Sequence, residues 1–485
     1  MQFKIQIMGV LFLIIGFYSS HLVAKPTSIQ QDLHILKHGI ETIHPGYKRY
    51  TTDQQRKAMW EHINTVLTND SPLAQVYLEI SRLTALLRCD HTIAEFPKAL
   101  EEQKKQRFLP FQFRIFDKKM YVESVQNELS LKKGDEIIRI NNIEIDEIIN
   151  KLSPLMPRDG YTDHTAVSSI ENNFNLLGSG FEQFFALEVL KLNQFPKEYS
   201  LQIKSLKTGT ISTQKVHTIS FDDWLALYGG SYRLDFKDAI DLKFKDNYAV
   251  LKIDTFVNYR NPINAKSVFK KIFKQLKQKH VSHLIVDLRN NGGGSDDVQL
   301  ALMKFLYNSP FQLNDAAWFT YSELGDLKQY INTWQKDILS PDVSQLNKEA
   351  NGYRVKNKDM GENYLIQKPA KMAFDGEIIM LTSRHNSSAS AALLAHIKHQ
   401  ENVTLVGEST GGNQGGTNGT VMLFLKLPHT GISVRIPVFR NSYTIPNKQD
   451  GLGAQPDISV IEDFNSWINE RDKIMNKAIE LTKTK

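Results

Sequence analysis

The chain has 485 residues but only one cysteine, Cys89. A single thiol cannot form an intramolecular disulfide bond, so a disulfide-stapled fold is excluded and stability must come from a buried core. Cys89 is followed by Asp90 and His91, which raises the question of a Cys–His site. Because adjacent residues of an extended chain point to opposite faces, we instead expect Cys89 to be a small buried residue.

Long blocks of one charge are also absent. The 59 basic and 53 acidic residues give a net charge of +6, and no basic run exceeds a few residues. This pattern is typical of a solvated surface, so we expect no nucleic-acid binding. The histidine pairs 34/38 and 396/399 have helical spacing, but they lack a third ligand or the glutamate of an HExxH motif. We therefore expect them to be surface or core residues and predict no metal site.

Apolar runs are short everywhere except at the start. Residues 1–24 contain Lys4, then an apolar stretch over 7–18, then small and polar residues that end at Ala24. This order is typical of a secretory signal peptide with cleavage after Ala24. A retained membrane anchor is the alternative, but the stretch is shorter than the ~20 residues that a span requires. We expect an exported protein, periplasmic or extracellular, without stable membrane insertion after cleavage.

The length predicts two or three domains. Residues 25–104 carry three apolar stripes at helical spacing and predict an N-terminal helical domain. Residues 105–235 form a mixed domain. Its segment 131–149, LKKGDEIIRINNIEIDEII, resembles the second half of a PDZ module, although the glycine-rich carboxylate-binding loop of PDZ modules is not evident. Residues 151–235 show no clear pattern.

Residues 236–485 alternate between strand and helix patterns. This βαβ series predicts an α/β domain with a mostly parallel sheet, interrupted by a less regular insertion over 308–375. The expected strands are 248–256, 283–289, 377–382 and 403–407, and the expected helices are 265–279, 296–307 and 388–400.

Functional groups of such sheets collect at the carboxyl ends of the strands. Residues 287–297 read DLRNNGGGSDD, and the three glycines predict an anion-binding nest of backbone N–H groups, with a flexible turn as the alternative. Residues 381–397 read LTSRHNSSASAALLAHI, with serines among alanines where a strand turns into a helix. A serine here is either a helix N-cap or a hydroxyl exposed near the positive end of the helix dipole.

Three segments in this order, LIVDLRNNGGG, SSASAALLAHI and TLVGESTGG, resemble the tail-specific or carboxyl-terminal processing serine peptidases. These are relatives of tricorn protease and of interphotoreceptor retinoid-binding protein. The resemblance implies a crotonase-like ββα spiral in the catalytic domain, with Ser388 as the nucleophile. Ala391 stands where the family usually has glutamate.

The resemblance also implies the other site residues. One branch of the family uses a lysine base, but the matching position here is Asn413, so a Ser–Lys dyad is contradicted. The tricorn-type branch takes its base from an early motif that CDHT (89–92) fits, which makes His91 the base. In DGLGAQPD (450–457), Asp450 aligns with that branch's glutamate and is the expected third residue, with Asp90 as the second choice. The expected oxyanion donors are the N–H groups of Ala389 and Gly293, with Gly294 next in line.

The sequence therefore predicts an exported serine endopeptidase that acts on unfolded or C-terminal polypeptide segments and needs no metal or organic cofactor. A non-catalytic relative that carries apolar ligands is the main alternative. A peptide-binding adaptor that works through the PDZ-like segment is a weaker one. Side-chain preference and oligomeric state do not follow from the sequence.

Overall fold

The computed structural model describes residues 28–126, 129–171, 179–227, 234–344, 346–350 and 352–483. The predicted signal peptide lies outside these ranges. Within the described ranges, none of the helices combines the length and apolar character needed to cross a bilayer.

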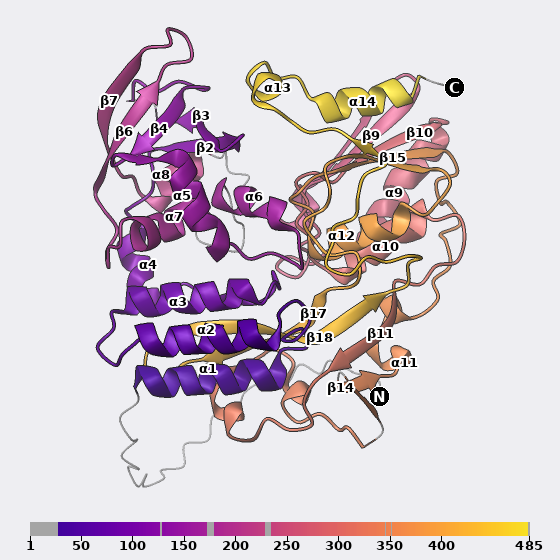
Figure 1. Cartoon of the computed structure of the whole chain (residues 1–485). Coiled ribbons are helices and arrows are strands. Elements are labelled where there is room, and N and C mark those ends of the chain that lie inside the picture. Colours follow the sequence, from indigo (N-terminus) through magenta and orange to yellow (C-terminus); the bar gives the residue numbers. More distant parts are fainter. Residues whose placement is uncertain are drawn as a thin grey trace, which may run out of the picture.

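The described part of the chain begins with a layer of three helices (Figure 1). Each buries its apolar stripe, and the first two start at side-chain caps, Ser28 and Thr52. The layer packs over the strands β17 (Asn418–Lys426) and β18 (Ser433–Tyr443), with which it shares one hydrophobic core. The three predicted helices are confirmed: α1 (Ile29–Ile43), α2 (Asp53–Val66) and α3 (Leu73–Leu86).

The mixed region folds as an antiparallel sheet in the order β2-β3-β4-β6-β7, with β5 paired to β4. The chain turns around Lys118 and at Asn141-Asn142, and all three residues have positive φ. The strands are β2 (Phe111–Phe116), β3 (Lys119–Val125), β4 (Glu136–Ile140), β5 (Ile143–Glu144), β6 (Glu198–Lys204) and β7 (Ile211–His217). The accompanying helices are α4 (Lys98–Lys104), α5 (Ile145–Leu152), α6 (Ala166–Glu171), α7 (Gly180–Phe184) and α8 (Phe221–Ala226).

The predicted α/β series forms a sheet in the order β19-β16-β15-β10-β9-β8, parallel throughout except for the β8–β9 pair. Alternate residues face opposite sides: Leu284 and Val286 pack with α9, α10 and α12, while Ile285 packs with α14. The strands are β8 (Ile240–Phe244), β9 (Tyr248–Ile253), β10 (His283–Asp287), β15 (Glu377–Thr382), β16 (Val403–Gly407) and β19 (Ile458–Ser459). The helices are α9 (Ala265–Gln278), α10 (Asp296–Leu306), α12 (Ser388–Ile397) and α14 (Lys473–Leu481).

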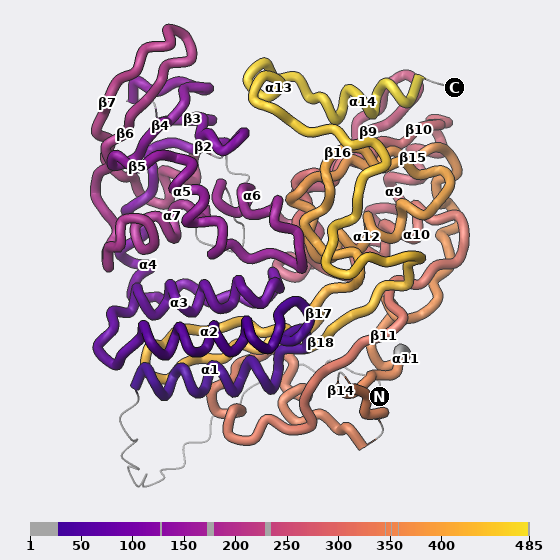
Figure 2. The backbone as a smooth tube through the Cα atoms, in the orientation of Figure 1, coloured from indigo at the N-terminus to yellow at the C-terminus, as the bar shows by residue number. Residues whose placement is uncertain are grey.

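A third sheet, antiparallel, is built largely from segments that the sequence pattern left unassigned. Its order is β12-β17-β18-β11-β14-β13, and the short strand β1 (Ile93–Ala94) also pairs with β18. The remaining elements are β11 (Asn314–Phe319), β12 (Ile331–Asn332), β13 (Asn347–Glu349), β14 (Gly352–Val355), β17 (Asn418–Lys426), β18 (Ser433–Tyr443), α11 (Asn357–Met360) and α13 (Phe464–Ile468). From this sheet the yellow end of the chain passes β16 and reaches α13 and α14 (Figure 2).

Candidate active site

The two predicted functional loops follow neighbouring strands. β10 and β15 pair in parallel, so the glycine loop after β10 and the serine loop after β15 leave the same edge of the sheet. Ser388 is the first residue of α12 and has φ +49°, a conformation that residues with a side chain rarely adopt. Gly293 lies so close that a Cβ there would stand 2.8 Å from the Cβ of Ser388. This sharp strand-to-helix turn presents the hydroxyl at the rim of the sheet.

His91 reaches Ser388 from the opposite end of the chain. It lies in the turn between α3 and β1, and its Nε2 is 3.3 Å from Ser388 Oγ. The turn is held at both ends, because β1 pairs with β18 and the guanidinium Nε of Arg435 donates to the carbonyl oxygen of His91 at 2.9 Å. The neighbouring Thr92 is buried and contacts His44 Nε2 through its hydroxyl at 2.7 Å.

Asp90 contacts the other nitrogen of the same imidazole. Its Oδ1 lies 2.7 Å from Nδ1 of His91, although neither atom makes a hydrogen bond of regular geometry within the described residues. Its Oδ2 accepts a hydrogen bond from the Ser387 hydroxyl. Burial alone would raise the pKa of Asp90, but the imidazole charge and the hydrogen bonds outweigh it and lower that pKa to about 2. For His91, burial favours the neutral ring, but the Asp90 charge prevails and raises its pKa.

Asp450 has different partners from those that the sequence predicts. It accepts hydrogen bonds from Arg49, from Tyr50 Oη at 3.1 Å and from Asn413 Nδ2 at 3.0 Å. None of its hydrogen bonds or ion pairs to the described residues involves His91. Burial would raise the pKa of Asp450, but Arg49 outweighs it and lowers that pKa. The contact with the base that was expected of Asp450 is made by Asp90, the second choice.

The glycine loop forms part of the expected nest. Gly293 and Gly294 have φ of +102° and +140°. The N–H of Gly293, however, already donates to Asn291 Oδ1 at 2.8 Å. Among the described residues, the N–H groups of Gly294 and Ala389 have no hydrogen-bond partner. The N–H of Gly294, the second choice, is therefore more available than that of Gly293 to donate a hydrogen bond to an oxyanion together with Ala389.

Substituting Gly293 by alanine is expected to disrupt this turn. The added Cβ would lie 2.8 Å from the carbonyl oxygen of Ser387 in a positive-φ conformation, so Ser388 must shift. We expect kcat to fall by about 10²–10³-fold, the loss typical of a damaged oxyanion site. Gly209→Ala is the matched control, because Gly209 has φ +70° and nothing within 4 Å. Steady-state kinetics on both variants measures these losses. Equal losses of kcat in the two variants would contradict the expectation.

Asp159 is a buried carboxyl group behind the site that no sequence motif indicated. It is 1% exposed, its Oδ2 accepts the backbone N–H of Asn413 at 3.1 Å, and its Oδ1 has no hydrogen-bond partner among the described residues. Burial, together with the nearby Asp90 charge, raises the pKa of Asp159 to about 7. Near neutral pH this group therefore titrates beside the Asp90–His91 pair.

Asp159→Asn is expected to remove the free-energy cost of ionising this buried carboxyl group, a cost that grows with pH. A folded-state pKa of about 7 lies above the unfolded value of about 4, so the native state loses stability as the pH rises from 4 to 7. Asparagine does not ionise, so the variant should gain stability relative to the natural protein, by about 2–3 kcal/mol more at pH 8 than at pH 5. Urea unfolding at both pH values measures this difference. A stability difference that does not change with pH would contradict it.

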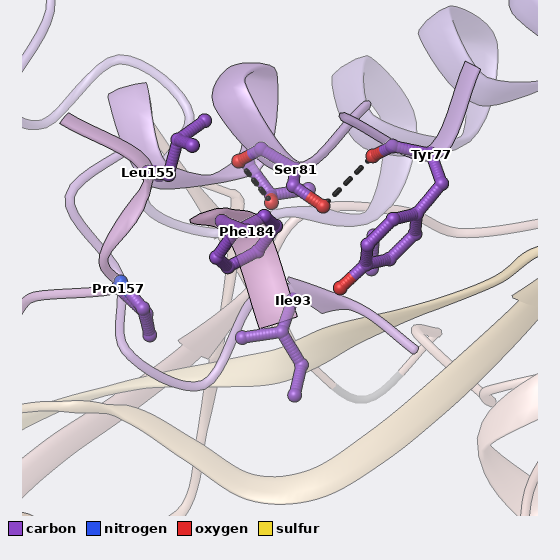
Figure 3. Close-up of a pocket in the computed structure, with 9 residues that line it drawn as sticks. Tyr77, Ser81, Ile93, Leu155, Pro157 and Phe184 are labelled. Atoms are coloured by element: carbon purple, nitrogen blue, oxygen red, sulfur yellow. Dashed lines mark hydrogen bonds between the residues drawn. The ribbon is translucent and has the colours of Figure 1, made fainter. Parts of the chain in front are cut away.

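A separate hollow lies beside the strand that follows His91 (Figure 3). It has about 10 Å³ that a water molecule could occupy and is lined mainly by apolar side chains. Its hydroxyls are engaged locally: Ser81 Oγ donates to the Tyr77 carbonyl at 2.8 Å, and Thr84 Oγ1 donates to the Ser81 carbonyl at 3.0 Å. None of the predicted catalytic residues lines this hollow.

Among the described residues, no group of three or more His, Cys, Asp and Glu side chains could hold a metal ion.

Comparisons with known proteins bear on the fold and on the family. A sequence model of Peptidase family S41 matches residues 247–460, which include the glycine loop, Ser388 and Asp450. A structure of mature CPAF complexed with lactacystin has 15% identity and a TM-score of 0.61, covering 93% of this chain and 97% of that one. A serine-to-alanine mutant of CPAF has 14% identity and a TM-score of 0.63, covering 94% and 97%. At this identity the likeness shows a shared fold. No curated protein matches the sequence. Residues 247–460 of this chain therefore belong to peptidase family S41, a family of serine peptidases.

Proposed function

We propose that this protein is an exported serine endopeptidase that hydrolyses peptide bonds in unfolded or C-terminal polypeptide segments. The observation that carries the proposal is the 3.3 Å contact between Ser388 Oγ and His91 Nε2, made by residues 297 positions apart. A nucleophile next to a base that a third group orients is the arrangement that acyl transfer requires. The distance is slightly longer than an ideal hydrogen bond, as is common in sites without substrate.

In the proposed reaction, Ser388 Oγ attacks the scissile carbonyl carbon while His91 Nε2 takes the hydroxyl proton. Asp90 stabilises the imidazolium, and the N–H groups of Gly294 and Ala389 bind the oxyanion of the tetrahedral intermediate. Collapse of the intermediate breaks the C–N bond, and His91 gives its proton to the leaving amine. Water then attacks the acyl-enzyme with His91 as the base again, which releases the carboxylate product and restores Ser388.

The finer architecture belongs to the same proposal. We assign residues 25–104 to a helical domain, 105–235 to a PDZ-like domain and 236–485 to the catalytic domain with a crotonase-like spiral. The antiparallel sheet of β2 to β7 and the mostly parallel sheet β19-β16-β15-β10-β9-β8 are compatible with this division. The helical layer nevertheless shares its core with the neighbouring sheets, so we expect the three parts to unfold together.

The main alternative is a non-catalytic carrier of apolar ligands. Pockets for small molecules typically have volumes of roughly 300–1,000 Å³. The hollow of Figure 3 has only about 10 Å³ that a water molecule could occupy, which is far below that range. The contact between His91 and Ser388, by contrast, has no evident use in a carrier, so the observations favour catalysis.

Incubation of the purified enzyme with a substrate protein tests the proposal. The same substrate protein is offered in two forms, one unfolded by reduction and alkylation and one folded. We expect new internal N-termini by mass spectrometry from the unfolded form, little cleavage of the folded form, and full inhibition by a fluorophosphonate. Organic extraction of the purified protein should yield no stoichiometric lipid. Absence of new termini, or cleavage that the fluorophosphonate does not inhibit, would contradict the proposed activity.

A further inference from the structure

Ser387 stands at the N-cap position of α12, but its hydroxyl does not cap the helix. In an ordinary serine cap, Oγ accepts an N–H of the first turn. Here the N–H groups of Ser390 and Ala391 donate to the carbonyl oxygen of Ser387 at 3.1 and 3.2 Å. The hydroxyl donates instead to Oδ2 of Asp90. The usual local role of an N-cap serine therefore does not explain this side chain.

Both ends of the Ser387–Asp90 hydrogen bond are held firmly. A Cβ on Gly293 would stand 2.8 Å from the Ser387 carbonyl oxygen, and a Cβ on Gly412 would stand 3.2 Å from Ser387 Cα. The two glycines thus let the chain close tightly around Ser387. On the other side, Arg435 donates to the carbonyl oxygens of Asp90 and His91 at 3.4 and 2.9 Å. Little backbone movement is available to either partner.

The carboxylate itself needs a second anchor. The terminal torsion of an aspartate side chain is broad, so contact at one oxygen leaves the group free to rotate. The contact of Asp90 Oδ1 with His91 Nδ1 joins two adjacent residues and is not a hydrogen bond of regular geometry. A donor at Oδ2 removes this freedom and keeps Oδ1 facing the imidazole.

We propose that Ser387 is a positioning residue, which acts through Asp90 to hold the imidazole of His91 toward Ser388. The role rests on the proposed function. Four side chains contact one another in sequence, from Ser388 through His91 and Asp90 to Ser387. The first and the last of them are consecutive residues. The hydroxyl of Ser387 thereby fixes the carboxylate of Asp90, which in turn orients the imidazole that acts on Ser388.

The rate of fluorophosphonate labelling of Ser388 tests this role without knowledge of the substrate. We expect Ser387→Ala to slow labelling by about tenfold to a hundredfold, the effect of one hydrogen bond to a charged group. Ser387→Thr should label within about threefold of the natural rate, because the extended backbone at 387 (φ −134°) accepts a β-branched residue that keeps the hydroxyl. Ser409→Ala is the control, because the hydroxyl of Ser409 accepts a hydrogen bond from Gln455.

A double-mutant cycle separates positioning from a structural role. If Ser387 acts through Asp90, Ser387→Ala has no further effect on labelling in an Asp90→Asn background. Equal slowing in both backgrounds, or a natural labelling rate for Ser387→Ala, would overturn the role. Thermal unfolding of each variant verifies that it is folded. Failure of the natural protein to label, or labelling of Ser388→Ala, is a distinct result: it overturns the proposed function and this role with it.

Discussion

Replacement of Asp90 by asparagine is expected to lower kcat by about 10⁴-fold and to leave KM nearly unchanged. The carboxylate lies 2.7 Å from His91 Nδ1, where it stabilises the imidazolium that forms as Ser388 loses its proton. Asparagine keeps the shape but supplies no charge, and its amide can hold the imidazole in the wrong tautomer. The loss should therefore appear in the chemical step.

The pH profile of kcat/KM gives a second, independent measure of Asp90→Asn. His91 must be neutral to act as a base, and Asp90 raises its pKa above the usual 6.5. Activity of the natural protein should therefore fall as the pH drops below a midpoint above 6.5. In the variant this midpoint should move to lower pH, because the stabilising charge is gone.

Asp450→Asn is the matched control for Asp90→Asn. Asp450 pairs with Arg49 and has no contact with His91 among the described residues, so we expect its loss to change kcat by less than about tenfold. The buried Arg49 would lose its counter-charge, so stability should fall. A loss of about 10⁴-fold in Asp450→Asn, with a mild effect in Asp90→Asn, would restore the assignment that the sequence favoured.

Replacement of His91 by alanine should have a still larger effect, about 10⁶-fold on kcat. Without the imidazole, no other side chain among the described residues hydrogen-bonds Ser388 Oγ and could accept its proton. Binding and the oxyanion donors remain, so weak residual activity over the background should persist. Steady-state kinetics on a peptide substrate measure the loss.

His164→Ala is the control for His91→Ala, since His164 is exposed and its ring contacts the carbonyl oxygen of Ser409 at 3.2 Å. We expect it to keep activity within about twofold. Comparable activity of His91→Ala and His164→Ala would show that His91 is not the base.

Local patterns were sufficient to predict the N-terminal helices and the mostly parallel sheet. The strands 377–382 and 403–407 have the same bounds in the structure, because each is a continuous apolar run buried on both faces. The third sheet was not predicted. Its long strands β17 and β18 pair with each other, but their other neighbours, β12, β11 and β1, come from distant segments, and no short window of sequence specifies such pairing.

In the candidate active site too, contacts between distant segments could not be predicted from local patterns. The roles of Ser388 and His91 follow from the resemblance of short motifs to a known family, and the structure brings the two residues together. The partner of Asp450 depends on how its loop docks: Gly160 and Gly451 approach so closely that a side chain on Gly160 would overlap the Gly451 backbone. That docking places Asp450 beside Arg49, which is about 400 residues away in the chain. By contrast, Asp90 was available in the CDHT motif itself, next to the base.

Peptide mapping of the fluorophosphonate adduct tests the central claim most directly, because it reports which hydroxyl reacts and whether His91 is needed. We predict one adduct, on Ser388, in the natural protein, none in Ser388→Ala, and labelling slowed beyond detection in His91→Ala. An adduct that persists in Ser388→Ala, or forms at the natural rate in His91→Ala, would contradict the account.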